Sequence, residues 1–315
     1  GAGTDENPYL ISQVSEMTSI LDDDMFHSMS FMMVEDVLMT LTDPIEINND
    51  RKVSFSGTFD GNGHKLSFSG NGGLFHEITE TGVVKNLIVD ETTVLSAAEE
   101  NLYAIGAVAD FNHGLIENID SRASLTNARL QGELPVYDGS IDTTDLTTGA
   151  GGIVGVNEAS GRVSLVTVGG SGAVKAGRGV GGVAAYNFGL IEDANVTATL
   201  PAGNQANSGK SSNTYSFGGG IAGFNFGTIT TSHVSGRVFA QSAYSTSGDG
   251  NEGKNIGFGG IAGYNEGTIS ESSFARNLSM KEFIDKSRAI ELEDSANNLG
   301  VASVHGDLYV GGIAG

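Results

Sequence analysis

The sequence predicts an all-β protein with the right-handed parallel β-helix fold, a solenoid in which the chain winds through stacked coils. Three observations predict it. A pattern of paired glycines, small apolar residues and Asn-x-Gly recurs along the chain. Strand-like runs of three to seven residues lie between Gly, Asn and Ser turns. Glycine makes up 47 of 315 residues and proline only 4. One coil cannot bury its apolar face alone, so coils of this kind stack on one another.

Each repeat carries one asparagine at the same place, directly before a glycine turn. Asparagine tolerates left-handed backbone and can hydrogen bond to neighbours above and below it in a stack. We therefore expect the repeated residue to form an internal structural ladder rather than a ligand site. The members of this predicted ladder are Asn112, Asn157, Asn187, Asn225 and Asn265.

The asparagines are 45, 30, 38 and 40 residues apart, so the coils are not of equal length. We interpret this as a constant core of about 25 residues per coil, with loops of different length inserted at one corner. Four polar stretches fit such insertions, and the last contains a run, 283–290, that could form a short helix. The four are Gly132–Thr148, Pro201–Ser216, Gln241–Asn255 and Lys281–Gly306.

The first 50 residues differ from the rest and are predicted to form an N-terminal cap and the first coils, before a repeat region over 51–315. Apolar residues at helical spacing (Val14, Met17, Ile20 and Leu21) predict a helix that covers the open end of the first coil. Strands are expected at Tyr9–Ile11, Met32–Met39 and Ile45–Ile47. The sequence stops inside a Gly-Gly-Ile-Ala-Gly copy, so we expect the natural chain to continue.

The chain is strongly acidic, with 38 Asp and Glu against 16 Lys and Arg and a net charge of −22. This charge disfavours binding to nucleic acid, and no apolar run approaches the ~20 residues that span a bilayer. The absence of cysteine excludes disulfides and thiol catalysis. No two of the six histidines lie four apart, so no metal site is expected. Calcium is the one cofactor that the acidic surface leaves open, although the spaced carboxylates of an EF-hand are missing.

Three sequence features together resemble the GLUG-motif proteins of bacteria. They are the segments 3–11 and 57–64 and the Gly-Gly-Ile-Ala-Gly-Tyr-Asn-x-Gly-Thr-Ile repeats. This motif occurs in large surface and secreted proteins, including adhesins and the N-terminal regions of IgA-specific metallopeptidases. The resemblance implies a secreted or cell-surface β-helix. It also implies a non-catalytic segment, since the His-Glu-x-x-His zinc helix of the peptidases is absent from this sequence.

Parallel β-helices also include polysaccharide lyases and hydrolases, which act through paired carboxylates or a base. The candidate pairs here are Asp60 with His64 and Asp110 with His113. Asp60 lies in an Asp-Gly-Asn-Gly run that a turn explains, and Asp110 is expected to face solvent, so neither pair is taken as catalytic. Three glutamates at similar offsets after the turns predict an acidic stripe on the outer face: Glu117, Glu192 and Glu271.

Aromatic residues in or beside the insertions are the candidate binding residues, because aromatic side chains in polar loops contact carbohydrates and proteins. They are Tyr137, Tyr215, Tyr244 and Phe283. Loops that leave every coil at one corner would align into a ridge. The sequence thus favours a non-enzymatic adhesion module that binds an extracellular glycan or protein or associates with itself. Three alternatives stay open: a stiff stalk that binds nothing, the substrate-binding region of a secreted metallopeptidase, and a polysaccharide lyase or hydrolase.

Overall fold

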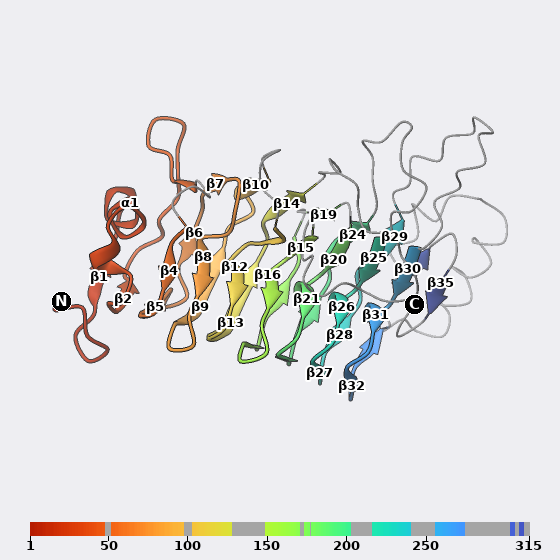
Figure 1. Cartoon of the computed structure of the whole chain (residues 1–315). Helices are drawn as coiled ribbons and strands as arrows, with labels where there is room; N and C mark the ends of the chain where they lie inside the picture. Colours follow the sequence, from red (N-terminus) through yellow and green to blue (C-terminus); the bar gives the residue numbers. More distant parts are fainter. Residues whose placement is uncertain are drawn as a thin grey trace, which may run out of the picture.

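The computed structural model describes residues 1–47, 52–97, 103–127, 149–170, 173–176, 178–202, 216–240, 256–274, 303–305 and 309–311. The chain is a parallel β-helix, as predicted: its coils stack along one axis, and strands from successive coils pair side by side (Figure 1). Strands β16 (Val154–Asn157) and β21 (Ala184–Asn187), for example, pair in parallel with Asn157 opposite Asn187.

Four sheets run along the axis. From residue 83 onward the chain passes through them in a fixed order, sheet 1, sheet 2, sheet 3 and sheet 4, whereas the coils before it have no described strand in sheet 3. Sheet 1 consists of β1 (Tyr9–Ile11), β2 (Phe31–Met33), β5 (Thr58–Asp60), β9 (Val83–Val89), β13 (Leu115–Ser121), β17 (Arg162–Ser164), β22 (Leu190–Glu192), β27 (Thr228–Thr230) and β32 (Thr268–Ser270), and of a second row, β6 (Lys65–Leu66), β18 (Thr167–Val168), β23 (Asn195–Val196), β28 (His233–Val234) and β33 (Ser273–Phe274).

The remaining strands form the other three sheets. Sheet 2 consists of β3 (Glu46–Ile47), β7 (Ser69–Gly70), β10 (Val94–Ser96), β14 (Ser124–Asn127), β19 (Val174–Ala176), β24 (Thr199–Ala202), β29 (Arg237–Ala240) and β34 (Ser303–His305). Sheet 3 consists of β11 (Ile105–Gly106), β15 (Gly149–Gly151), β20 (Gly179–Gly181), β25 (Ser216–Gly219), β30 (Ile256–Gly259) and β35 (Tyr309–Gly311). Sheet 4 consists of β4 (Ser54–Phe55), β8 (Phe75–Ile78), β12 (Ala109–Asn112), β16, β21, β26 (Ala222–Asn225) and β31 (Ala262–Asn265).

Aliphatic side chains fill the interior in columns that follow the axis. In sheet 1 the same inward position holds Ile116, Val163, Ile191 and Ile229 in four successive coils, and all four are fully buried. Because side chains alternate between the two faces of a strand, the positions on either side of each one face outward. Burying a side chain of this kind contributes about 1.5–3 kcal/mol, so each coil is stabilised mainly by its neighbours.

The glycine of each Asn-x-Gly turn is required by the close approach of successive coils. A Cβ built on Gly189 would overlap the carbonyl oxygen of Gly161, and one built on Gly227 would overlap the carbonyl oxygen of Gly189. The turns therefore stack backbone on backbone, and any side chain there would separate the coils.

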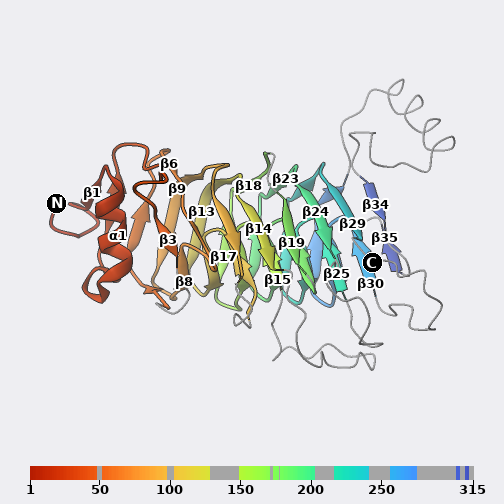
Figure 2. The same ribbon diagram turned by 90° about the horizontal axis from the view of Figure 1, so that it is seen from above.

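The N-terminal helix α1 (Val14–Asp22) lies between β1 and β2 and covers that end of the stack (Figure 2). It buries the four apolar residues at helical spacing, which confirms the predicted helix, and Glu16 accepts a 2.7 Å hydrogen bond from the backbone N–H of Ser12 at its start. A short 3-10 helix, η1 (Asp24–Phe26), follows it. Neither helix is long and apolar enough to cross a membrane, and the same holds for every helix in the described residues.

The strand expected over Met32–Met39 is shorter than predicted. Strand β2 ends at Met33, and beyond it only Val37 makes an isolated bridge, to Leu66. The chain turns sharply at Thr40 and Asp43, whose backbones hydrogen bond to each other, and β3 then contains Glu46 and Ile47 alone. A cap over 1–50 as a separate unit stays a prediction.

Candidate binding groove and loop corner

Three of the four long insertions join the same two sheets. Residues 128–148 lie between β14 and β15, 203–215 between β24 and β25, and 241–255 between β29 and β30, so all three connect sheet 2 to sheet 3. Residues 275–302 instead connect β33 of sheet 1 to β34 of sheet 2. The prediction of one common corner is therefore wrong for the fourth insertion.

Two of the predicted insertions, Pro201–Ser216 and Lys281–Gly306, overlap described strands, whereas Gln241–Asn255 matches the gap between β29 and β30. Pro201 and Ala202 belong to β24, Ser216 opens β25, and residues 303–305 form β34. The candidate binding residues themselves, Tyr137, Tyr215, Tyr244 and Phe283, lie outside the described residues, as does the helix predicted over 283–290. Their role in binding stays a prediction.

The structure brings the five repeated asparagines together in one column inside the stack. The side-chain amide of each donates to the side-chain oxygen of the next, at 2.9 Å from Asn112 to Asn157, 2.8 Å to Asn187, 2.7 Å to Asn225 and 2.7 Å to Asn265. The first four side chains are fully buried. An amide that both donates and accepts can continue such a chain without leaving a buried polar atom unpaired, so this column is structural.

Asp60 and His64 do not form a pair. Asp60 accepts from the backbone N–H of Asn62 (2.8 Å) and from the side-chain amide of Asn86 (3.0 Å), which is the turn role that its sequence context predicts. His64 instead lies 3.2 Å from Asp36. The backbone N–H of Lys65 also donates to Asp36 and holds the pKa of that carboxyl below its usual value.

Asp110 does not face solvent, and its partner is His76 rather than His113. The carboxyl is fully buried, lies 3.3 Å from Nδ1 of His76 and accepts a 2.9 Å hydrogen bond from the backbone N–H of Gly73. Burial raises the pKa of Asp110 above its ordinary value. His113 pairs with Glu77 at 3.5 Å. Both pairs join neighbouring coils, and neither brings two carboxylates together.

The three glutamates predicted as an acidic stripe are not in line. Glu117 and Glu192 occupy one column of sheet 1, but the buried Ser164 lies between them, and Glu192 is paired with Arg162. Glu271 follows β32 at the bend of its coil, in a different column. In the part of the chain that the structure describes, no three His, Asp or Glu residues gather closely enough to hold a metal ion. A calcium site stays a prediction.

An aromatic column on the outer side of sheet 4 is structural rather than a platform for a ligand. The rings of Tyr186 and Phe224 are fully buried and stacked at 4.8 Å, and those of Phe188 and Phe226 are stacked at 5.0 Å with only 8° between their planes. The stacked rings cover each other's faces along the axis. The faces that Phe188 and Phe226 turn toward each other are thus closed to a sugar ring, which binds against an aromatic face.

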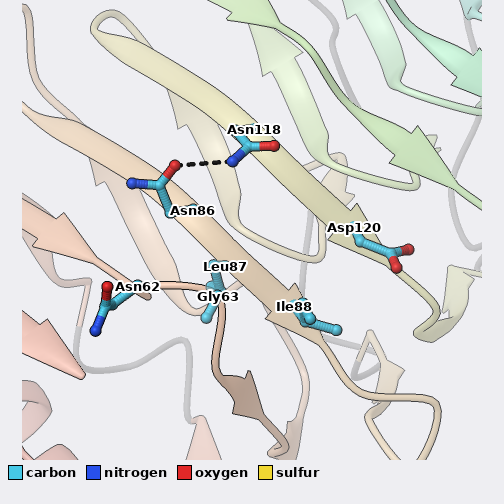
Figure 3. A pocket seen from close by; sticks show the side chains of 7 residues that line it. All are labelled: Asn62, Gly63, Asn86, Leu87, Ile88, Asn118 and Asp120. Carbon is cyan, nitrogen blue, oxygen red and sulfur yellow. Dashed lines mark hydrogen bonds between the residues drawn. The ribbon is translucent and has the colours of Figure 1, made fainter. Parts of the chain in front are cut away.

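Sheet 1 carries an open groove of about 460 Å³ where it bends between its two rows of strands. Its polar lining is Asn62, Asn86, Asn118 and Asp120, and Leu87 and Ile88 add an apolar part. Asn118 donates to the side-chain oxygen of Asn86 at 2.8 Å, and Figure 3 shows these two amides on adjacent strands with the Asn118 oxygen pointing away from that bond. Asn86 in turn donates to Asp60, so the amides are held in place.

Backbone conformation places these amides at the bend. Asn62, Asn86 and Asn118 have φ of 50°, 54° and 54°, the left-handed region that asparagine tolerates best after glycine. The same bend recurs in later coils with residues of other types: Leu165, Asp193, Thr231 and Glu271, with φ of 47–54°. The stack thus imposes the conformation, and among the described residues that adopt it at this bend only those in the coils of β5, β9 and β13 are asparagines.

Sequence reasoning missed this groove, although a weak signal for it exists. Asn86 and Asn118 each stand two residues after an inward-facing strand position, Val84 and Ile116, which are opposite each other in register. Without that register, isolated asparagines in a Gly- and Asn-rich chain give no reason to group them.

The stacked coils place this chain in the class of elongated repeat proteins with the parallel β-helix fold. Comparisons with known proteins agree with this fold. No family model matches the chain. It is 28% identical over 166 residues to halomucin from Haloquadratum walsbyi, which covers 47% of this chain and 2% of halomucin. It is 32% identical over 138 residues to a candidate Gly-rich membrane protein from Evansella cellulosilytica, which covers 38% of this chain and 15% of that protein. The chain thus spans a small part of either relative.

A solved structure shares the fold along the whole chain. The crystal structure of a candidate immunoglobulin A1 protease from Bacteroides ovatus superposes with a TM-score of 0.57, covering 99% of this chain and 86% of that one, at 17% sequence identity. At this identity the similarity establishes the fold and nothing further.

Proposed function

We propose that the chain is a non-catalytic, extracellular β-helical module of a longer surface protein, with the GLUG-type repeat as its building unit, that presents loops for contact with glycans or proteins. The observation that carries the proposal is that three long insertions connect the same two sheets, in a stack whose asparagine ladder is uninterrupted from Asn112 to Asn265. A rigid stack with variable loops at one corner is the usual arrangement of a binding surface on a repeat protein.

The comparisons support the part of the proposal that makes this chain a module of a longer protein. Halomucin and the Gly-rich membrane protein are both far longer than this chain, as the coverage of 2% and 15% shows. The similarity to the B. ovatus protein supports a second version of the proposal, in which the module is the substrate-binding region of a secreted peptidase that has its catalytic residues elsewhere.

A short natural connection between sheets 2 and 3 can serve as the template for loop-replacement variants that test the proposal. The coil from Asn157 to Asn187 takes only 30 residues and joins β19 to β20 through positions 177 and 178. Replacing 241–255 with Gly-Arg, the dipeptide found there, would give β29 and β30 the same short connection, and the same replacement of 203–215 provides a second variant. Binding would be measured on a glycan array, on whole cells and on immobilised immunoglobulin A1, which separates the adhesion and peptidase versions.

We expect both loop variants to keep the melting temperature within about 2 °C, since lengthening or shortening a surface loop changes loop-closure entropy only slightly. We expect at least one of them to lose binding on the surface that the native protein recognises. Native-level binding by both variants would show that the loops do not contact a partner and would leave the stiff-stalk interpretation.

A further inference from the structure

We infer that the groove on sheet 1 binds a linear, uncharged oligosaccharide that runs along the axis of the solenoid. This inference rests on the proposed function as a glycan-binding module, but it places a site on sheet 1 rather than at the corner between sheets 2 and 3. The groove is lined by three asparagines, Asp120, Leu87 and Ile88, and it is open to solvent along the surface.

The first argument is the repeat of the amides. Asn86 and Asn118 occupy equivalent positions on β9 and β13, which pair in register, so the same group recurs at the strand spacing of about 4.8 Å. A polymer that lies across the strands meets an equivalent hydrogen-bonding group at each coil. A compact ligand could use only one of them.

The second argument is that the groove offers fixed groups to hydroxyls. The bonds from Asn118 to Asn86 and from Asn86 to Asp60 set the amide orientations before any ligand arrives. The Asn118 oxygen points away from the bond to Asn86, and the Asp120 carboxylate lies farther along the same strand (Figure 3). Both line the groove and can accept hydrogen bonds from sugar hydroxyls. Ile88 supplies an apolar patch for the C–H face of a sugar ring.

The third argument concerns charge. Among the described residues around the groove, the lysines and the arginine each have an acidic partner: Lys85 with Asp60 (3.6 Å), Arg122 with Asp120 (2.7 Å) and Lys65 with Asp90 (3.6 Å). No unmatched cation is therefore available to a carboxylate or sulfate group, and the net charge of −22 repels anionic polymers. These features favour a neutral chain over a polyuronate or a sulfated glycan.

The chain itself supplies the variant for the test. The next coil places Leu165 and Thr167 at the positions that Asn118 and Asp120 occupy, with the same left-handed bend at Leu165. The double variant Asn118→Leu, Asp120→Thr therefore copies a surface that the fold already accepts. The matched control is Thr231→Leu, which makes the same kind of change at the same bend, three coils beyond the groove.

Binding would be measured by calorimetry and by shifts of the side-chain amide signals, with cellohexaose and chitohexaose as neutral probes and a hexamer of galacturonate as the anionic probe. We expect the native protein to bind at least one neutral hexamer, with shifts at the Asn86 and Asn118 amides. The double variant should bind at least ten-fold more weakly, and Thr231→Leu should bind as the native protein does.

Three results would overturn the inference. They are no binding of either neutral hexamer at millimolar concentration, binding of the galacturonate hexamer as tight as that of the neutral ones, and unchanged binding by the double variant. If only a loop-replacement variant loses hexamer binding, the binding site lies at the corner between sheets 2 and 3. That result would refute the groove as the site and would support the proposed function. Loss in the double variant alone, with loop variants normal on arrays and cells, would keep the groove and refute the loop-presentation proposal.

Discussion

Replacing Asn187 with alanine tests whether the internal ladder is the main polar support of the stack. Asn187 is fully buried, accepts from Asn157 at 2.8 Å and donates to Asn225 at 2.7 Å. Each buried hydrogen bond contributes about 1 kcal/mol net, and leaving the Asn225 oxygen buried without its donor costs at least about 1 kcal/mol more. The free energy of unfolding should therefore fall by about 3 kcal/mol, measured from the urea midpoint at unchanged slope.

The control is the same change at the last member of the ladder. Asn265 is only partly buried, and it accepts from Asn225 while donating to Gly267 of its own turn. Water can replace a partner there, so Asn265→Ala should cost about 1 kcal/mol. If the two substitutions lower stability equally, or if Asn187→Ala costs under about 0.5 kcal/mol, the ladder contributes no more than any surface amide and the reasoning is wrong.

Three further predictions concern single positions. Gly189→Ala should cost about 2–3 kcal/mol and lower the melting temperature, because its Cβ would overlap the carbonyl of Gly161; an unchanged melting temperature would contradict the stacking of the turns. Burial raises the pKa of Asp110, so this carboxyl, which faces His76, contributes stability below its unfolded pKa that is lost as pH rises through its folded pKa. Urea unfolding of Asp110→Asn should accordingly show its stability relative to the native protein improving from pH 4 to pH 8, and a pH-independent difference would refute the burial argument. Leu165→Asn should stabilise the protein by about 0.5–1 kcal/mol, because Leu165 has φ 54° and a half-exposed side chain (53%); a lower melting temperature would argue against it.

The repeat allowed much of the stack to be predicted, because every coil must pair the same buried polar group. A buried asparagine needs partners above and below, and the asparagines of the neighbouring coils recur at the height where they can supply them. The helix over Val14–Asp22 was predictable for a different reason. Its apolar residues recur at helical spacing, whereas the strands around it alternate, so the change of period marks the cap.

Pairings between coils could not be predicted where the repeat is degenerate. Asp110 takes the place that Gly155 and Gly223 hold in later coils, which suggested a side chain facing solvent. Its environment is set instead by His76 of the previous coil. His76 directly follows a degenerate copy of the repeat at 72–75, in a coil where Ile78 stands in place of the marker asparagine. The same gap in register hid the partners of His64 and His113 and assigned Glu271 to the wrong column.

The bend of sheet 1 separates what the fold requires from what the surface is free to vary. Seven residues of five types, among them a leucine, a threonine and a glutamate, all take φ between 47° and 54° there. The conformation is thus imposed by the coils on either side, at some cost wherever the residue is not asparagine. A position whose backbone is held by its neighbours can carry any side chain that its surroundings use. Asparagine occurs in three consecutive coils, at the one stretch where a groove lies over the bend and where Asp60 and Asp120 flank it. Structural need alone would distribute asparagine along all seven coils, so its concentration beside the groove is better explained by what the groove contacts.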